Sequence, residues 1–168
     1  MTVPESLAVS RFLTSRVPVS VEVFSLFFGP GGTIAYTFTQ SPLGPECPDP
    51  DCMARELSVH PPDVLHSTSW RWEDPGCLVL TYLAVLDQAH SDAMFQVVQA
   101  SDFSSVVETN PRKPRPDRIS RLAVLGHGLR HLSFLAADPT QTEFRTALGP
   151  AARETLGALP SGPAGRLG

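Results

Sequence analysis

The fold is decided by residues 64–86, which read VLHSTSWRWEDPGCLVLTYLAVL. The two parts of this stretch, 64–72 and 78–86, are rich in β-branched and aromatic residues, and Asp74-Pro75-Gly76 between them is a turn signal. The stretch therefore predicts an antiparallel hairpin. Its second strand is apolar on both faces, so we expect it in the middle of a sheet and covered on both sides.

A second hairpin is predicted upstream of the first. The odd positions of residues 17–23 are all valine and alternate with Pro18, Ser20 and Glu22, which is typical of a strand with one buried and one solvated face. The glycine-rich turn 29–32 follows, and residues 33–39 alternate again. Residues 41–53 contain four prolines and predict an exposed loop.

The C-terminal third predicts helices. Residues 110–116 form a proline-rich linker, and Asp117 is placed as the N-cap of a helix that runs to about Ala137. The apolar residues of that helix recur at three-and-four spacing: Leu122, Leu125, Leu129, Leu132 and Ala136. Residues 140–143 fit a capping box for a second helix, which Gly149-Pro150 must interrupt or restart. Residues 87–109 fit either a strand or a short helix.

These elements predict an α+β fold. We expect an antiparallel sheet of four to six strands, built from two β-hairpins and covered on one face by a C-terminal helix pair. Strands that precede helices, instead of alternating with them, distinguish this fold from a doubly wound sheet. The length suits a single domain over residues 1–160, with 161–168 as a flexible C-terminal tail.

The composition narrows the classes of partner. The net charge of −4 gives no overall attraction to phosphate backbones, which argues against a nucleic-acid partner. All basic residues except Lys113 are arginine, which we interpret as the mark of a GC-rich bacterial genome. No membrane span or secretory segment is recognisable, and three cysteines do not form a disulfide framework, so we expect a cytoplasmic protein.

Two sets of residues could bind a metal. His127 and His131 lie four apart on the predicted helix, so both imidazoles leave one face, although a third ligand is needed and the glutamate of an HExxH motif is absent. Hydrogen-bonded histidines on a partly buried face explain the same pair. Cys47 and Cys52 could bind zinc together with His60 and Cys77, oxidise as a thiol pair, or have no role.

A third candidate site, a catalytic one, contains His66. His66-Ser67-Thr68 resembles the His-x-Thr/Ser signature of the 2H phosphoesterases, and His131-Leu132-Ser133 is the matching second copy. The resemblance implies phosphoester chemistry with His66, Thr68 and His131 as candidate catalytic residues. It covers these two motifs alone, and it departs from the family because the second motif falls in a predicted helix, whereas the family's histidines act from paired strands.

Aromatic and basic residues suggest binding surfaces. A period of two places Trp70 and Trp72 on the strand face that carries His66, where they could line a ligand pocket or belong to the core. Tyr82 and Arg130 complete the candidate ligand-binding residues. The basic run 112–121 could dock an anion at a helix N-terminus or be a solvated linker.

No convergent catalytic set follows from the sequence. The leading hypothesis is therefore a binding or interaction module without catalytic activity, with a homodimer or a protein partner as its form of association. The rival hypothesis is a small hydrolase, metal-assisted or similar to the 2H phosphoesterases, that uses His66, His127 and His131. This rival requires the three imidazoles to converge.

Overall fold

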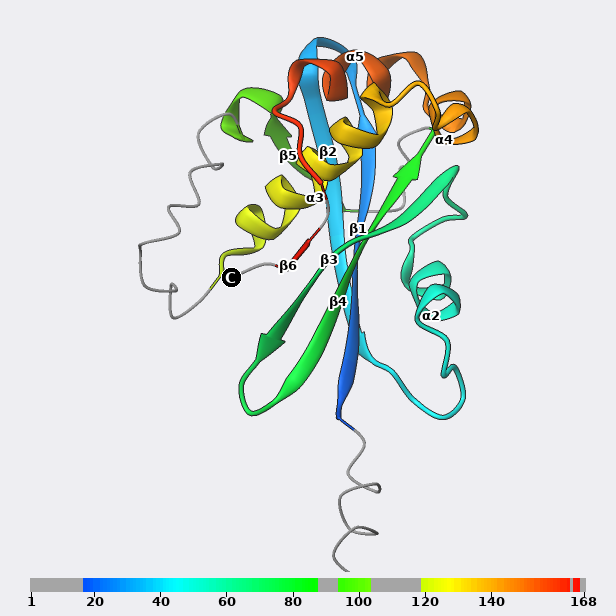
Figure 1. Cartoon of the computed structure of the whole chain (residues 1–168), viewed down its shortest axis with the longest axis vertical. Helices are drawn as coiled ribbons and strands as arrows, with labels where there is room; N and C mark the ends of the chain where they lie inside the picture. Colours follow the sequence, from blue (N-terminus) through cyan, green and yellow to red (C-terminus); the bar gives the residue numbers. More distant parts are fainter. Residues whose placement is uncertain (1–16, 88–93, 104–118, 164, 167–168) are drawn as a thin grey trace, which may run out of the picture.

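A computed structural model describes residues 17–87, 94–103, 119–163 and 165–166 (Figure 1). The elements follow in the order β1 (Val19–Phe28), a 3₁₀ turn (Pro30–Gly32), β2 (Thr33–Pro42), α2 (Pro50–Leu57), β3 (Val64–Glu73), β4 (Cys77–Leu86), β5 (Gln96–Gln99), a second 3₁₀ turn (Ala100–Phe103), α3 (Arg121–Ala137), α4 (Thr142–Ala147), α5 (Pro150–Ala158) and β6 (Gly165–Arg166). The α+β class is confirmed.

The strands form one six-stranded sheet in the order β5-β2-β1-β4-β3-β6. Both predicted hairpins are present, β1 with β2 and β3 with β4. The prediction of a purely antiparallel sheet is wrong, because β1 and β4 pair in parallel and the sheet is mixed. Each hairpin places its more apolar strand at the centre, where burial on both faces favours such strands.

Helices cover both faces of the sheet, so the predicted cover on one face describes only part of the arrangement (Figure 1). On one face, α3 and α5 bury a core that contains Phe24, Leu83 and Leu129. On the other face, α2 packs Ala54 against Val21, and Tyr82 belongs to the same cluster. Strand β4 is therefore covered on both sides, as its sequence predicted.

The predicted loop over residues 41–53 is present at 43–49, but the prediction is wrong at its ends, because β2 runs to Pro42 and α2 begins at Pro50. Asp49 is its N-cap, and the side chain of Asp49 accepts a hydrogen bond of 3.1 Å from the backbone N–H of Asp51. Pro50 occupies the first helical turn, where a missing N–H costs nothing and a fixed φ is suitable. The prolines that argued against a helix therefore define its beginning.

Helix α3 begins at Arg121, close to the predicted position, but its N-cap is Ser120, whose Oγ accepts a hydrogen bond of 3.1 Å from the N–H of Ala123. Asp117 lies outside the described residues. Gly128 is where the helix approaches the sheet most closely, since a Cβ at this position would lie 2.9 Å from Leu83 Cδ1. This close approach brings the next helical turn, which carries His131, against β3.

The second predicted helix is divided in two by Gly149-Pro150, as expected, into α4 and α5. The predicted capping box is wrong, because Gln141 holds the N-cap position of α4 and the Thr140 hydroxyl donates to the Asp138 carboxylate at 2.7 Å. Beyond α5, the N–H of Gly162 donates to the carbonyl of Arg130 at 3.2 Å. Residues of the predicted flexible tail then form β6, which pairs in parallel with β3.

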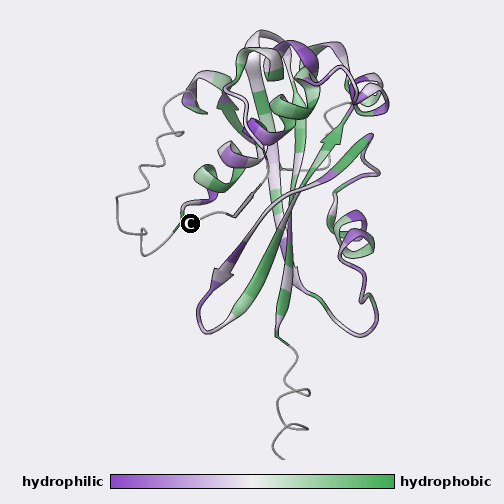
Figure 2. Cartoon of the chain, in the orientation of Figure 1, coloured by the Kyte–Doolittle hydropathy of each residue, from purple (hydrophilic) through white to green (hydrophobic). Residues whose placement is uncertain are grey.

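The ambiguous stretch 87–109 contributes the edge strand β5, which pairs antiparallel with β2, and the second 3₁₀ turn. The predicted linker 110–116 lies outside the described residues. Hydrophobic residues are concentrated on the central strands β1 and β4 (Figure 2). Among the helices that the structure describes, none combines the length and the apolar character that crossing a bilayer requires.

Candidate functional site

The side chains of His66 on β3 and His131 on α3 contact each other where the helix packs on the sheet. Their Nε2 atoms are 3.1 Å apart, although the residues are 65 positions apart in the chain. The rings lie 5.1 Å apart between centroids at an angle of 30°. Phe134 stacks on His131, and the ring of Phe144 from α4 stands at an angle to His66. The structure therefore brings together two of the predicted histidines within a partly aromatic environment.

The environment of the pair favours the uncharged form of both imidazoles. Burial lowers the pKa of His66 below its usual value. Burial also lowers the pKa of His131, and the neighbouring charge of His66 lowers it further. A neutral pair shares one hydrogen bond, in which one Nε2 donates and the other accepts. The backbone of Gly162 lies beside His131 and partly offsets the lowering.

The hydroxyl groups of the two His-x-Thr/Ser motifs are committed elsewhere. Thr68 is buried, and its Oγ1 donates to the carbonyl of Thr81 at 3.4 Å. Ser133 is also buried, and its Oγ donates to the carbonyls of Leu156 at 2.7 Å and Leu159 at 3.2 Å. The motifs therefore place their imidazoles together, while their hydroxyl groups tie the strand and the helix to neighbouring backbone.

His127 does not complete a metal site with the pair. In the part of the chain that the structure describes, three side chains with suitable ligand atoms come within 4.8 Å of one another at one place, and they are Cys47, Cys52 and Glu56. The charge of His127 nevertheless acts on His131 and contributes to the lowering of its pKa. The two histidines at four-residue spacing are thus neighbours, without a third ligand among the described residues.

A β-bulge in β3 separates the tryptophans from His66. The pairing of β3 with β4 shifts between Ser67 and Ser69, so Thr68 is the extra residue and the alternation of faces reverses beyond it. His66 faces α3, whereas Trp70 and Trp72 project from the opposite face, where they are 38% and 50% exposed. The prediction that His66 and the tryptophans share a face is wrong, and so is the interpretation of the tryptophans as core.

Tyr82 and Arg130 lie on opposite sides of the sheet. Tyr82 is buried under α2 and donates a hydrogen bond of 2.6 Å to Asp51, and burial together with this carboxylate raises its pKa. The guanidinium of Arg130 on α3 lies directly against Gly162, where an added Cβ would come within 2.2 Å of its Nε. These two candidate ligand-binding residues serve the packing of α2 and of the C-terminal segment.

An ion-pair network was missed by the sequence analysis. Glu22, expected on a solvated face of β1, is 2% exposed and is held by the guanidinium of Arg71. Arg71 also binds Glu73, and the Thr81 hydroxyl donates to Glu22 at 2.5 Å. In the sequence, β1 carries one charged residue, Glu22, and β3 carries two, Arg71 and Glu73, and this pattern does not reveal that Glu22 and Arg71 pair.

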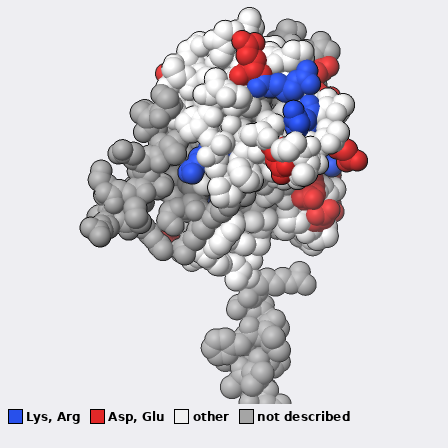
Figure 3. All heavy atoms as spheres, turned by 45° about the horizontal axis from the view of Figure 1, so that its top comes forward, with Lys and Arg blue, Asp and Glu red and all other residues white. Residues whose placement is uncertain are grey.

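The basic run at residues 112–121 is described only at its end, where the guanidinium of Arg121 lies 4.0 Å from the centre of the Phe38 ring. At the end of the molecule formed by α4 and α5, basic and acidic side chains are mixed, and the drawn residues show no extended basic surface there (Figure 3). Comparison of the chain with family models, with curated proteins and with solved structures found no match.

Proposed function

We propose that this chain is a binding domain without catalytic activity, which takes up an extended segment of a partner polypeptide along the outer edge of β3. The observation that carries the proposal is the exposure of Trp72 and Trp70 on the sheet face beside that edge, at 50% and 38%. Tryptophan supplies a large apolar area together with a hydrogen-bond donor, and it is enriched among the residues that dominate binding.

The edge of β3 already accepts an extended segment. Its inner side pairs with β4 along Val64–Glu73, but among the described residues its outer side pairs only with the short β6, at Ser69 and Trp70. A strand with unpaired backbone groups is a template for another strand. The short contact with β6 supports an edge geometry that accommodates a parallel strand, and the remaining residues of β3 offer further positions.

The apolar surface beside this edge extends inward from the tryptophans. Trp72 is opposite Leu78 on β4, and Trp70 is opposite Leu80, so aromatic and aliphatic side chains share this face. Alternate apolar side chains of an added strand would therefore contact the tryptophans while its backbone pairs with β3. The partner chemistry that suits this surface is an extended polypeptide with alternating apolar residues.

The test uses intrinsic fluorescence, because Trp70 and Trp72 are the only tryptophans in the chain. A synthetic peptide of about ten residues that alternates leucine and threonine should shift the emission in a saturable manner. Trp72→Ala should weaken this binding by about tenfold or more. The remaining tryptophan still reports on binding in each single variant.

Leu122→Ala is the matched control, since Leu122 is also a large exposed apolar residue but lies on α3. Peptide binding that is equally weak in Leu122→Ala and Trp72→Ala would contradict the proposal, as would the absence of a fluorescence change. Light scattering at the same concentrations shows whether a second copy of the chain fills the edge. A dimer that Trp72→Ala dissociates would replace the partner polypeptide by a second copy.

A phosphoester hydrolase is a second candidate, and the contact between His66 and His131 favours it. In phosphoester hydrolysis one imidazole would take a proton from the attacking water, and the imidazolium so formed would supply the proton that the leaving group needs; the contact of 3.1 Å would let His66 and His131 share that proton. This candidate predicts hydrolysis of bis(p-nitrophenyl) phosphate, with or without added zinc, that His131→Ala abolishes. If the wild-type protein shows no turnover, or if His131→Ala keeps the wild-type rate, the imidazole pair is not catalytic.

A further inference from the structure

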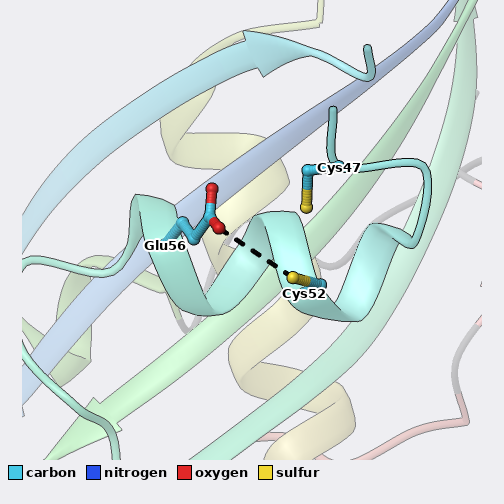
Figure 4. A group of neighbouring side chains, drawn as sticks. All are labelled: Cys47, Cys52 and Glu56. Carbon is cyan, nitrogen blue, oxygen red and sulfur yellow. Dashed lines mark hydrogen bonds between the residues drawn. The ribbon is translucent and has the colours of Figure 1, made fainter. Parts of the chain in front are cut away.

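Three potential metal ligands gather along α2 and the loop before it, on the opposite face of the sheet from the histidine pair. The Sγ atoms of Cys47 and Cys52 and a carboxylate oxygen of Glu56 all lie within 4.8 Å of one another. Figure 4 shows the Cys47 sulfur pointing toward the helix and the Cys52 sulfur pointing toward the Glu56 carboxylate, to which the Cys52 thiol donates at 4.0 Å. Cys52 and Glu56 are four residues apart on α2, which stacks their side chains on one face.

Local structure fixes the position of Cys47 before the helix begins. Cys47 forms a β-bridge with Gly44 and is buried, so the loop that carries it is held in place. Two residues later, Asp49 caps α2 and sets the direction of the helix. The fold therefore positions both cysteines, Cys47 in the loop and Cys52 in the first turn of the helix.

The charges around the thiols favour a cation. The carboxylates of Glu56 and Asp49 both act electrostatically on the Cys47 thiol, so negative charge surrounds the sulfur atoms. A bound divalent cation would neutralise this charge and take the two sulfur atoms as thiolates.

We propose that Cys47, Cys52 and Glu56 bind one zinc ion, which fastens the beginning of α2 to the loop that precedes it. Two thiolates and a carboxylate form a ligand set that zinc accepts, with water in the fourth tetrahedral position. Around a tetrahedral zinc ion two sulfur ligands are about 3.8 Å apart and a sulfur and an oxygen ligand about 3.5 Å, so atoms within 4.8 Å need to approach by about 1.3 Å at most. His60 and Cys77, which the sequence suggested as further ligands, lie outside this group.

Titration of the full chain with cobalt(II), after reduction with a phosphine, tests the site. Wild-type protein should develop the visible absorption of thiolate-bound cobalt, and zinc should displace it. Cys52→Ser should abolish the absorption, and Glu56→Gln should weaken zinc binding by about tenfold because a neutral amide replaces a charged ligand. Cys52 is exposed, so its replacement leaves the packing of the chain intact.

Cys77→Ser is the matched control, because Cys77 is the third cysteine and lies on β4 away from the group. It should bind cobalt and zinc as the wild-type chain does. In a thermal melt, zinc should raise Tm of the wild-type and Cys77→Ser proteins but not of Cys52→Ser. The proposal is overturned if reduced wild-type protein gives no thiolate absorption, if Cys52→Ser keeps it, or if Cys77→Ser loses it.

Discussion

Replacing Arg71 with methionine is expected to lower the free energy of unfolding by about 3–5 kcal/mol, because it leaves the carboxylate of Glu22 buried and without its cation. Methionine conserves much of the apolar stem of the arginine, so the loss should come from the charge and the hydrogen bonds instead of the volume. Urea denaturation followed by circular dichroism measures the effect.

The geometry explains why this ion pair is sensitive. Both amino groups of Arg71 reach Glu22, and the bond from Nη2 to Oε2 is 2.9 Å long. The same guanidinium donates through Nε to Glu73 at 3.0 Å. Glu22 and Thr81 are almost completely buried, so water cannot replace the guanidinium if it is removed. In the variant the Glu22 carboxylate keeps the hydrogen bond from Thr81 but has lost the cation beside it.

Two further variants separate the charge from the rest of the site. Combining Arg71→Met with Glu22→Leu removes both charges, and we expect this double variant to recover most of the lost stability. Glu73→Gln should cost less than about 1 kcal/mol, because Glu73 is 45% exposed. If Arg71→Met alone costs no more than Glu73→Gln, the pair does not stabilise this sheet.

The hairpins were predictable because their signals are local. The alternation over residues 17–23, the glycine-rich turn and the Asp-Pro-Gly turn each act within a few positions. The parallel pairing of β1 with β4 was not predictable from such signals. It joins two strands that are distant in sequence, and nothing within either hairpin states which strand of the other will be its neighbour.

Helix α2 and the bulge at Thr68 show a second limit of prediction from local sequence patterns. The prolines near residue 50 were interpreted as helix breakers, but their effect depends on position: Pro50 in the first turn begins a helix that it would interrupt further along. The bulge adds one residue to β3, and a single inserted residue reverses the face of every later side chain. The two-residue alternation therefore holds for His66, before the bulge, but it assigns both tryptophans, which follow the bulge, to the wrong face.

The candidate site, too, was predictable only where it depends on local signals. The proximity of His66 and His131 could be stated beforehand only as a condition, since it depends on where α3 crosses β3, and Gly128 determines how closely it does so. The grouping of Cys47 and Cys52 could be drawn from the sequence, but Glu56 replaced the ligands that the sequence suggested because α2 was not foreseen. Both groups of side chains are brought together by long-range packing, which local sequence patterns do not reveal.

The stability of the protein is expected to fall as the pH decreases below about 6.5, through protonation of His66 and His131. Folding lowers the pKa of both imidazoles, mainly by burial, so below that pH the unfolded chain binds more protons than the folded one. The stabilisation is therefore complete above the unfolded pKa and is lost as the pH falls through the folded pKa values. On unfolding in this pH range, the two imidazoles should together bind about two protons.

The contact between the imidazoles makes this loss steeper than burial alone. When both rings are protonated, neither Nε2 can accept, so the hydrogen bond of 3.1 Å is replaced by two like charges at that distance. The charge of Asp51 opposes the lowering at His66, and that of His127 adds to the lowering at His131. Acid should consequently weaken the packing of α3 on β3 first.

Urea midpoints measured between about pH 7 and pH 5 check this expectation in the wild-type protein, His66→Gln and the control His60→Gln. Glutamine cannot titrate but still offers His131 a hydrogen-bond partner, so His66→Gln should flatten the pH dependence by about one proton. His60→Gln is the control because it also removes one imidazole, from the loop between α2 and β3 and outside the contact of His66 with His131, and we expect it to keep the wild-type dependence. Equal slopes for the wild-type protein and His66→Gln would mean that the pair does not titrate in the folded chain as its burial requires.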